Sequence, residues 1–522
     1  MSTGSLRRPL EREGLALLSG LLLFLSFPKF GQGAVAWVAI GPLLVALNGT
    51  RGAQAIRLGY LTGASSALGI LYWTALVVIQ FGGLSRPVGI VVMFLLCLAF
   101  AIFPSLFAWL VGRFTTAFGP PGLLLAPFAW VATEFLRNRT FFNFPWCLLG
   151  YSQHANLPFV QIASVTAVYG VSFLIVMVSA LLAYVAVESR PALRRRALVG
   201  LAITLVGPWA WGTWVLSRPV IESGRIRVGL VQGGIRQEEK WAPDSAWANV
   251  ESHLALTEEA AARGARLLVW PESAVPFLYD DNPVLADALR AIVQRRSIYL
   301  VFGNDDLEGN RAGPAYRIFV GAKMLTPAGD LPFRYHKIRL VPFGEYVPMQ
   351  PLLTLGGRVT AKLVQEVADF TPGTEPTVAE VEGHHAGVFI CYEAIFPELV
   401  REFTARGADL LVNITNDAWY GTTSAPYQHL AMATFRAVEN GRYLVRAANT
   451  GITAVVDPRG RVLEPTRLFD RTVLVRDVPF VSGRTFYSLY GDVFAWGCFA
   501  IAASLAAATF RARPFNPGGA GR

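Results

Sequence analysis

Long apolar segments constrain the fold of this sequence more than any other feature. Eight of them approach or exceed the length needed to cross about 30 Å of hydrocarbon, at about residues 13–29, 34–48, 58–81, 88–112, 121–137, 160–187, 197–216 and 491–510. Hydrophobic residues make up 53% of the chain and charged residues only 16%, which is unusual for a soluble protein of this size. We therefore expect a polytopic α-helical membrane domain of about eight spans. Seven is the alternative, because the second segment is short and contains Gly41 and Pro42.

The arginines beside these segments predict an orientation. If the N-terminus is cytoplasmic and the chain crosses eight times, the short inner segments carry Arg7, Arg8, Arg12, Arg51, Arg57, Arg113, Arg190, Arg194, Arg195, Arg196, Arg511, Arg513 and Arg522. The outer segments carry Lys29, Arg86, Arg137, Arg139 and Arg218. Because positive charge gathers on the cytoplasmic side of membrane proteins, the long polar region before the last span is expected to face outward. The same bias accounts for the net charge of +10 without nucleic-acid binding.

The polar region between the last two spans is predicted to be a separate globular domain. Runs typical of strands lie at 225–234, 265–273, 297–305, 316–325, 385–393, 408–417, 442–451 and 453–460, and helical patterns lie at 244–263, 284–296 and 425–440. Continuous apolar strands alternating with helices indicate an α/β layered domain whose sheets are covered on both faces. We expect a membrane domain over 1–218, this domain over 225–480, a final span over 488–511 and a cytoplasmic tail over 512–522.

Three polar residues come just after, or close to, apolar runs where strands should end. They are Glu272 in WPESAVP, Lys337 in YHKIRLVPFGEYVP and Cys391 in GVFICYEAIFP. Taken singly, each has a plain structural interpretation, as a loop acid, a surface amine and a buried packing residue. Taken together they form a working nucleophile system, because a thiol with a pKa near 8.5 needs a base or a cation to react at neutral pH. Glu272 could be that base, and Lys337 could lower the thiol pKa and stabilise an oxyanion.

The sequence leaves other chemistry open or unsupported. A histidine could act as the base instead, and the candidates are His336, His384, His385 and His429. Cys97 and Cys498 lie in predicted spans, where cysteine is usually packing, and a disulfide between Cys147 and Cys391 is conceivable in an oxidising compartment. The ligand spacings suggest neither a metal site nor an organic cofactor.

The motifs around these three residues resemble the Glu-Lys-Cys set of the nitrilase superfamily, whose fold is an αββα sandwich. Further stretches, among them VNITNDAWYG, VQGGIRQEEKW and FFNFPWCLLGYSQ, extend the likeness over nearly the whole chain. The chain thereby resembles the membrane-embedded branch of that superfamily, the apolipoprotein N-acyltransferases. One position departs from the pattern, since Arg317 follows Tyr316 where relatives often have asparagine.

This resemblance implies a multi-pass enzyme of the bacterial inner membrane, with the catalytic domain facing the periplasm. It would transfer an acyl chain from a phospholipid, through a Cys391 thioester, to the α-amine of an S-diacylglyceryl cysteine at the N-terminus of an apolipoprotein. Glu272, Lys337 and Cys391 would be catalytic, and the supporting residues would be Trp241, Glu345, Tyr392, Glu393, Trp419 and Tyr420. The partners would be membrane phospholipid and the diacylated apolipoprotein, without nucleic acid, and the protein is expected to be a monomer.

Two other functions compete with this interpretation. A membrane-tethered amidase would use the same three residues and pass its acyl group to water, so exclusion of water from the thioester would distinguish the two. A transporter or receptor with an inactive outer domain would need polar residues inside its spans. Glu134 and Arg137 are the main candidates for that role.

Overall fold

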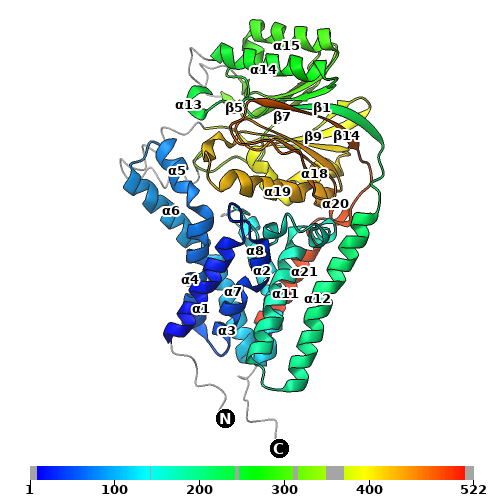
Figure 1. Cartoon of the computed structure of the whole chain (residues 1–522). Helices are drawn as coiled ribbons and strands as arrows, with labels where there is room; N and C mark the ends of the chain where they lie inside the picture. Colours follow the sequence, from blue (N-terminus) through cyan, green and yellow to red (C-terminus); the bar gives the residue numbers. More distant parts are fainter. Residues whose placement is uncertain (1–8, 141–142, 241–245, 310–315, 348–368, 512–522) are drawn as a thin grey trace, which may run out of the picture. The chain divides into compact units, whose positions relative to one another are not determined.

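The computed structural model describes residues 9–140, 143–240, 246–309, 316–347 and 369–511, which form two compact units (Figure 1). The helical unit comprises the described residues up to 76, residues 85–218 and the chain from 490 onward. The α/β unit comprises residues 77–84 and the described residues of 219–489.

The helical unit is built from helices of very different length. They are α1 (Pro9–Leu25), α2 (Gly33–Ala39), α3 (Gly41–Leu47), α4 (Gly52–Leu71), α6 (Arg86–Phe100), α7 (Ile102–Phe118), α8 (Ala126–Arg139), α9 (Leu157–Val160), α10 (Ala163–Thr166), α11 (Val168–Val187), α12 (Pro191–Ser217) and α21 (Val493–Arg511). Between α4 and α6 lies α5 (Trp73–Gln80), which runs from one unit into the other.

The expected number of eight spans is not confirmed. Four stretches of the described chain are long and apolar enough to cross a membrane, namely α6 with α7, α11, α12 and α21. A fifth is obtained if α4 and α5, which are bent by 53° relative to each other, count as one span. The apolar helices indicate a helical membrane protein. Among the described residues, the number of helices that qualify as spans is smaller than the eight that the hydropathy of the sequence predicted.

Local breaks explain why the other predicted spans fall short. The segment 34–48 divides at Ile40 into α2 and α3, because Gly41 and Pro42 begin a new helix. The segment 121–137 contributes only the 14 residues of α8, after a short 3-10 helix that begins at Pro120. Helix α1 has 17 described residues. Apolar composition alone therefore overestimated the length of continuous helix.

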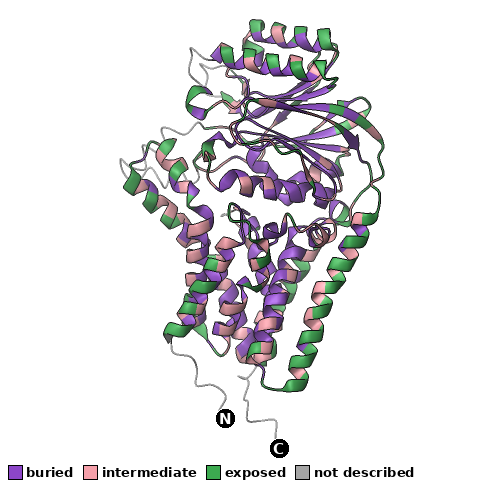
Figure 2. Ribbon diagram, viewed as in Figure 1, coloured by how far each residue is buried: buried purple, intermediate pink, exposed green. Residues whose placement is uncertain are grey.

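Small residues and apolar surfaces shape the helical unit. A Cβ atom on Gly59 of α4 would lie 2.3 Å from the carbonyl oxygen of Pro104 in α7, so glycine permits the close contact between these helices. Helix α12 instead exposes large apolar side chains, including Ile203, Val206 and Trp209 (Figure 2). Exposed apolar residues along a long helix are the surface expected to face lipid.

Two buried charged residues of α8, Glu134 and Arg137, serve the packing of the helical unit. Glu134 accepts a hydrogen bond from the main-chain N–H of Leu149 at 2.7 Å, and Arg137 donates to the carbonyl oxygen of Trp146 at 3.2 Å. The Arg137 guanidinium also lies 4.3 Å from the ring centroid of Phe100. Both side chains are buried and hold the segment that follows α8, so they have a structural role that does not require a transport pathway.

The α/β unit contains two six-stranded sheets. The first has the strand order β14-β1-β2-β3-β6-β7, and the second has the order β13-β12-β11-β10-β9-β8. The strands of the first sheet are β1 (Gly224–Gln232), β2 (Leu267–Val269), β3 (Tyr299–Gly303), β6 (Gly321–Leu325), β7 (Phe333–His336) and β14 (Thr472–Phe480). Those of the second are β8 (Val378–Val381), β9 (His384–Ile390), β10 (Leu410–Thr415), β11 (Tyr443–Ala448), β12 (Ala454–Val456) and β13 (Val462–Leu463).

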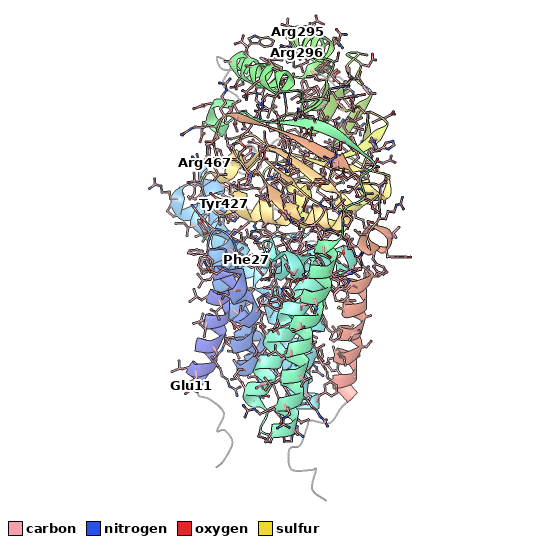
Figure 3. The ribbon with its side chains drawn as sticks, turned by 45° about the vertical axis from the view of Figure 1, so that its right-hand side comes forward. Glu11, Phe27, Arg295, Arg296, Tyr427 and Arg467 are labelled. Carbon is pink, nitrogen blue, oxygen red and sulfur yellow. The ribbon has the colours of Figure 1, made fainter. Side chains whose placement is uncertain are left out.

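The sheets pack face to face, and a pair of helices covers each outer face (Figure 1). Helices α14 (Ala246–Ala262) and α15 (Pro283–Arg296) lie over the first sheet, and α18 (Pro397–Ala405) and α19 (Ala425–Asn440) lie over the second. At the C-terminal end of α15, Arg295 and Arg296 pair with Glu258 on the outer surface (Figure 3). The architecture is the αββα sandwich that the nitrilase resemblance implied. All residues of β10 are buried and most of them are apolar, as expected for a strand that is covered on both faces.

The predicted strand 316–325 is the main local error. It divides into β5 (Arg317–Phe319), which pairs with β4 (Asp306–Glu308) in a separate small sheet, and β6 of the first large sheet. At the division a Cβ atom on Gly321 would lie 2.7 Å from the carbonyl oxygen of Asn304, so glycine permits the close approach of a neighbouring segment at the point where β6 begins. Strands β7, β8, β13 and β14 and helix α18 were not predicted.

Candidate active site

The ends of three strands bring Glu272, Lys337 and Cys391 together. Glu272 follows β2, Lys337 follows β7 and Cys391 follows β9. Strands β2 and β3 are parallel, and two successive antiparallel pairings through β6 give β7 the same direction, so β2 and β7 end at one edge of the first sheet. The main-chain N–H of Asn416, which follows β10, binds Glu272 and so joins this edge to the strand ends of the second sheet. The edge is where α/β folds commonly place their functional groups.

Lys337 lies between two carboxylates. Its Nζ atom is 2.9 Å from Oε1 of Glu272 and 2.5 Å from Oε1 of Glu345, and the lysine side chain is fully buried. Burial by itself would lower the pKa of Lys337, but Glu272 and Glu345 outweigh it and raise that pKa well above its usual value. Lys337 is therefore a fixed cation at neutral pH. Glu345 is itself held by the main-chain N–H of Val341, which donates to its Oε2 at 2.8 Å.

Glu272 is oriented by donors on both oxygens. Lys337 holds Oε1, and the main-chain N–H of Asn416, which follows β10 in the second sheet, donates to Oε2 at 2.9 Å. Because one carboxylate binds groups from both sheets, the strand ends of the two sheets meet at this site. A carboxylate fixed by two donors keeps a defined direction for accepting a proton.

Cys391 begins the 3-10 helix η5 (Cys391–Ile395) directly after β9 and is buried. Its φ of 48° lies in the left-handed region, which costs a residue other than glycine about 1–2 kcal/mol. Burial raises the pKa of the Cys391 thiol well above its ordinary value, Glu272 raises it further and Lys337 lowers it. The thiol is consequently neutral at rest and needs a base when it reacts. It is also a free cysteine, so the conceivable disulfide with Cys147 is wrong.

A pH titration checks this assignment of the resting state. Because the pKa of Cys391 is raised, thiolate should be the minor form at every pH below about 9. We expect the ultraviolet thiolate absorbance of the wild type, minus that of Cys391→Ser, to stay near zero up to that pH and to rise above it. A difference signal already complete near neutral pH would show a preformed thiolate and contradict the assignment.

Glu393 fastens the turns on which Lys337 and Cys391 stand. Its Oε1 accepts hydrogen bonds from the hydroxyl of Tyr335 at 2.7 Å and from the main-chain N–H groups of Ile338 and Arg339 at 2.7 and 3.2 Å. Its Oε2 accepts from the N–H of Ile390 at 2.7 Å. The two oxygens together accept four hydrogen bonds, about as many as a carboxylate has lone-pair sites, so Glu393 is a positioning residue in this geometry and has little capacity left to accept a proton.

We expect Glu393→Gln to lower the free energy of unfolding by about 2–3 kcal/mol, because its amide NH₂ would face main-chain donors and leave a buried N–H unpaired. The loss should appear as a lower thermal midpoint of the detergent-solubilised protein. Acyl transfer should fall with it, since Ile338 and Ile390 adjoin Lys337 and Cys391. A variant with an unchanged midpoint would show that these four hydrogen bonds contribute little. Glu398→Gln, whose carboxylate lies 3.8 Å from Arg339, is the matched control.

The predicted aromatic residues occupy different surroundings. Tyr392 is buried and packs edge to face on Phe396, with ring centroids 5.1 Å apart. Trp419 is 39% exposed and contacts the ring of Phe81 at 4.9 Å. Tyr420 lies on the same 3-10 helix, η6 (Asp417–Tyr420), with its ring edge to face on a histidine ring. Trp241 lies outside the described residues.

Two charged residues near Glu272 were missed by sequence reasoning. The Nζ atom of Lys240, at the end of α13 (Gln237–Lys240), donates to the main-chain oxygen of Glu272 at 3.1 Å. Burial lowers the pKa of Lys240 to about 8, and burial raises the pKa of Asp305 to about 7. The motif EEKW contains Lys240, but only its tryptophan was predicted to be a site residue. Asp305 stands in no recognisable motif.

The histidines are not the base in this geometry. The ring nitrogens of His429 lie 2.9 Å from Oδ1 of Asp417 and 3.1 Å from the main-chain oxygen of Cys391. His336 contacts Asp306 at 2.9 Å, His384 stacks on a phenylalanine ring, and His385 is exposed. Glu272 therefore remains the candidate base.

The remaining predictions concern Arg317 and metals. Arg317 is exposed and pairs with Glu308 at 2.9 Å across the small β4–β5 sheet, so its departure from the family pattern affects a surface hairpin. Within the described part of the chain, no group of three or more histidine, cysteine, aspartate or glutamate side chains could hold a metal ion.

Comparisons with known proteins cover nearly the whole chain. The carbon-nitrogen hydrolase family model matches residues 227–486, and the model of the apolipoprotein N-acyltransferase N-terminal domain matches residues 19–181. A relative from Geobacter metallireducens, named apolipoprotein N-acyltransferase, is 42% identical over 509 residues and 96% of both chains. One of the same name from Methylococcus capsulatus is 34% identical over 511 residues, again covering 96% of both chains.

Among solved structures, the chain is similar to a mutant of an amidase from Nesterenkonia sp. AN1 with acrylamide added at its active site cysteine. The identity is 26%, the match covers 49% of this chain and 93% of that chain, and the TM-score is 0.37. A score of this size supports no conclusion, so the assignment to a family rests on the sequence relatives.

Proposed function

The chain belongs to the apolipoprotein N-acyltransferase family, and on that premise we propose that it moves an acyl chain from a phospholipid to the N-terminal amine of a diacylated apolipoprotein. The observation that carries the proposal is the buried Lys337 cation between Glu272 and Glu345, close enough to the Cys391 thiol for Lys337 and Glu272 to shift its pKa. A neutral thiol, an oriented carboxylate and a fixed cation are the groups that a thioester mechanism requires.

In the first half-reaction Glu272 takes the proton of the Cys391 thiol as sulfur attacks an ester carbonyl of the phospholipid. The negative charge then develops on the carbonyl oxygen, where Lys337 can stabilise it. When this tetrahedral intermediate collapses, the bond between the carbonyl carbon and the glycerol oxygen breaks. The glycerol oxygen receives the proton from Glu272, and the lysophospholipid leaves. The enzyme keeps the acyl chain as a thioester on Cys391.

In the second half-reaction the amine of the apolipoprotein attacks that thioester. Glu272 accepts a proton from the attacking nitrogen, and the same proton returns to sulfur as the thioester bond breaks. An amide and the free thiol result. An acceptor that arrives as an ammonium ion must also release one proton to the surroundings before it attacks.

We further propose the setting of this reaction. Neither the lipid donor nor a diacylated acceptor leaves a bilayer readily, which explains why a nitrilase-type unit is joined to a membrane unit. The arginine bias supports about eight crossings, with α1, α2 together with α3, and α8 completing the count, in the bacterial inner membrane with the α/β unit on the periplasmic side. The protein is proposed to act as a monomer.

A transfer assay tests the proposal. The purified protein is incubated in detergent with phospholipid and a synthetic lipopeptide that carries an S-diacylglyceryl cysteine with a free amine. We expect the peptide to gain one acyl mass, and an otherwise identical peptide with an acetylated amine should gain none. Release of free fatty acid without peptide acylation would instead support a hydrolase.

A further inference from the structure

His429 is a buried residue that the proposed mechanism does not use, although it touches the nucleophile. It lies in the first half of α19, and its Nε2 atom is 3.1 Å from the main-chain carbonyl oxygen of Cys391. Its Nδ1 atom is 2.9 Å from Oδ1 of Asp417. His429 is fully buried and Asp417 nearly so, and both contacts are therefore shielded from solvent.

The partners of His429 determine what its ring can do. A carbonyl oxygen can only accept a hydrogen bond, so Nε2 carries a proton and donates it to Cys391. Arg446 holds the other oxygen of Asp417 at 2.8 Å. Burial would raise the pKa of Asp417, but Arg446 and His429 outweigh it and lower that pKa to about 2. Asp417 is therefore a carboxylate. The Arg446 nitrogen that binds it also lies 3.1 Å from Nδ1 of His429, so the carboxylate and the guanidinium together fix the orientation of the imidazole ring.

The residue that His429 anchors has a costly backbone conformation. Cys391 has a positive φ of 48° and is not a glycine, so its turn needs support from its surroundings. Glu393 supplies support on the N-terminal side of the turn through the N–H of Ile390. His429 supplies it at the carbonyl of Cys391 itself. Loss of this anchor would let the peptide group rotate and move the sulfur.

The same segment also holds the base. Asn416, whose main-chain N–H donates to Glu272, immediately precedes Asp417 in the chain. The space around this segment is tight, because a Cβ atom on Gly451 would lie 2.3 Å from Oδ2 of Asp417. The base is thus bound by residue 416, and the nucleophile is bound through residues 417 and 429.

We propose that His429 is a positioning residue that anchors the backbone of Cys391 and, through Asp417, ties it to the main-chain group that orients Glu272. The proposal deepens the acyl transfer proposed above and rests on it. It differs from a role for His429 as the base, because Nε2 already carries a proton that it donates to a carbonyl oxygen and so cannot accept one from sulfur.

Two substitutions separate this role from simple packing. In His429→Gln the amide nitrogen reaches about as far as Nε2 and can still donate to the Cys391 carbonyl, whereas in His429→Asn it reaches only about as far as Nδ1 and cannot. We expect the rate of thioester formation with phospholipid to fall less than about tenfold for Gln and about a hundredfold or more for Asn. The KM for phospholipid should change little in either variant.

A second readout does not depend on acyl transfer. Alkylation of Cys391 by iodoacetamide, followed by peptide mass spectrometry without lipid, should be close to the wild-type rate in His429→Gln and about tenfold slower in His429→Asn. Asn440→Ala is the control, because Asn440 is also buried on α19 and its side chain donates within that helix, to the carbonyl oxygen of Arg436. It should lower the thermal midpoint without changing either rate.

The outcomes separate the two proposals. If the wild type forms no thioester but alkylation still distinguishes Gln from Asn, acyl transfer is wrong and the anchoring role stands. If the wild type acylates and the two variants acylate and alkylate alike, the anchoring role is wrong. Should His429→Asn not fold, Asp417→Asn replaces it, and its weaker hold on the ring should slow alkylation severalfold. An unchanged alkylation rate in that variant would also overturn the proposal.

Discussion

Replacing Cys391 with alanine should abolish acyl transfer while leaving the protein folded. Removing a nucleophile that acts together with a base typically costs about 10⁴-fold or more in kcat. The side chain is small and buried at a strand end, so the change in packing is modest. We expect no detectable transfer to a lipopeptide by Cys391→Ala, measured by mass spectrometry, and a thermal midpoint within a few degrees of the wild type.

The three other cysteines provide the control for this result. Cys97 and Cys498 are buried on α6 and α21 of the helical unit, away from the water that a reactive thiolate needs. Cys147 is buried in the segment after α8. Cys97→Ala should keep its transfer activity. Residual transfer by Cys391→Ala within about tenfold of the wild type would mean that another residue is the nucleophile.

Replacing Lys337 with methionine should have the largest effect on stability. The variant leaves Glu272 and Glu345 buried at a site from which their shared cation has been removed. Breaking a buried ion pair on one side typically costs about 3–5 kcal/mol. We expect a correspondingly lower thermal midpoint in detergent, together with loss of transfer because the oxyanion and the thiol pKa lose their cation.

The pH dependence of this variant has a defined sign. Burial already raises the pKa of Glu345, and removal of Lys337, whose charge lowers it, raises that pKa further. The folded state then binds more protons than the unfolded state, so stability decreases as the pH rises through the interval between the unfolded and folded pKa values. The deficit should be smaller near pH 5 than near pH 8. Adding Glu345→Gln should recover part of the stability but none of the activity.

Lys323→Met is the matched control for Lys337→Met. Lys323 is equally buried on the adjacent strand β6, but it pairs with Asp306 at 2.7 Å. Its loss should destabilise the protein by a similar amount while the folded protein still transfers acyl groups. If both lysine variants lose activity in proportion to their stability, Lys337 has no special part in the chemistry.

Sequence reasoning found the groups of the candidate site because each stands in a local motif. WPES, YHKI and ICYE each place a polar residue one to three residues after a strand, and strands of one direction end at one edge of a sheet. The strands around 265–273 and 385–393 and the helix at 425–440 were predicted for the same reason, since their patterns are confined to a few neighbouring residues.

The contacts that organise the site could not be predicted in this way. The Asn416 N–H on Glu272 and the His429 ring on the Cys391 carbonyl involve main-chain atoms, which every residue has. A sequence pattern cannot distinguish the one main-chain group that is used. His429 was considered only as a base, because its side chain alone suggested proton transfer.

Long-range pairing and helix breaks explain the other differences. Strand β14 pairs with β1 from Gly224↔Phe480 to Gln232↔Thr472, and no local signal relates segments so far apart. In the helical unit, the break before Gly41 and the bend after α4 interrupt segments that hydropathy treats as continuous. The placement of the site residues at strand ends was therefore predicted better than the number of spans.

The most direct test of the central claim is the intact mass of the purified protein after incubation with phospholipid alone, in parallel with Cys391→Ser. The account predicts an added acyl mass on the wild type that hydroxylamine removes, as a thioester requires, and no such mass on the variant. A folded wild-type protein that remains unmodified with phospholipids of several headgroups would contradict the acyl-enzyme mechanism.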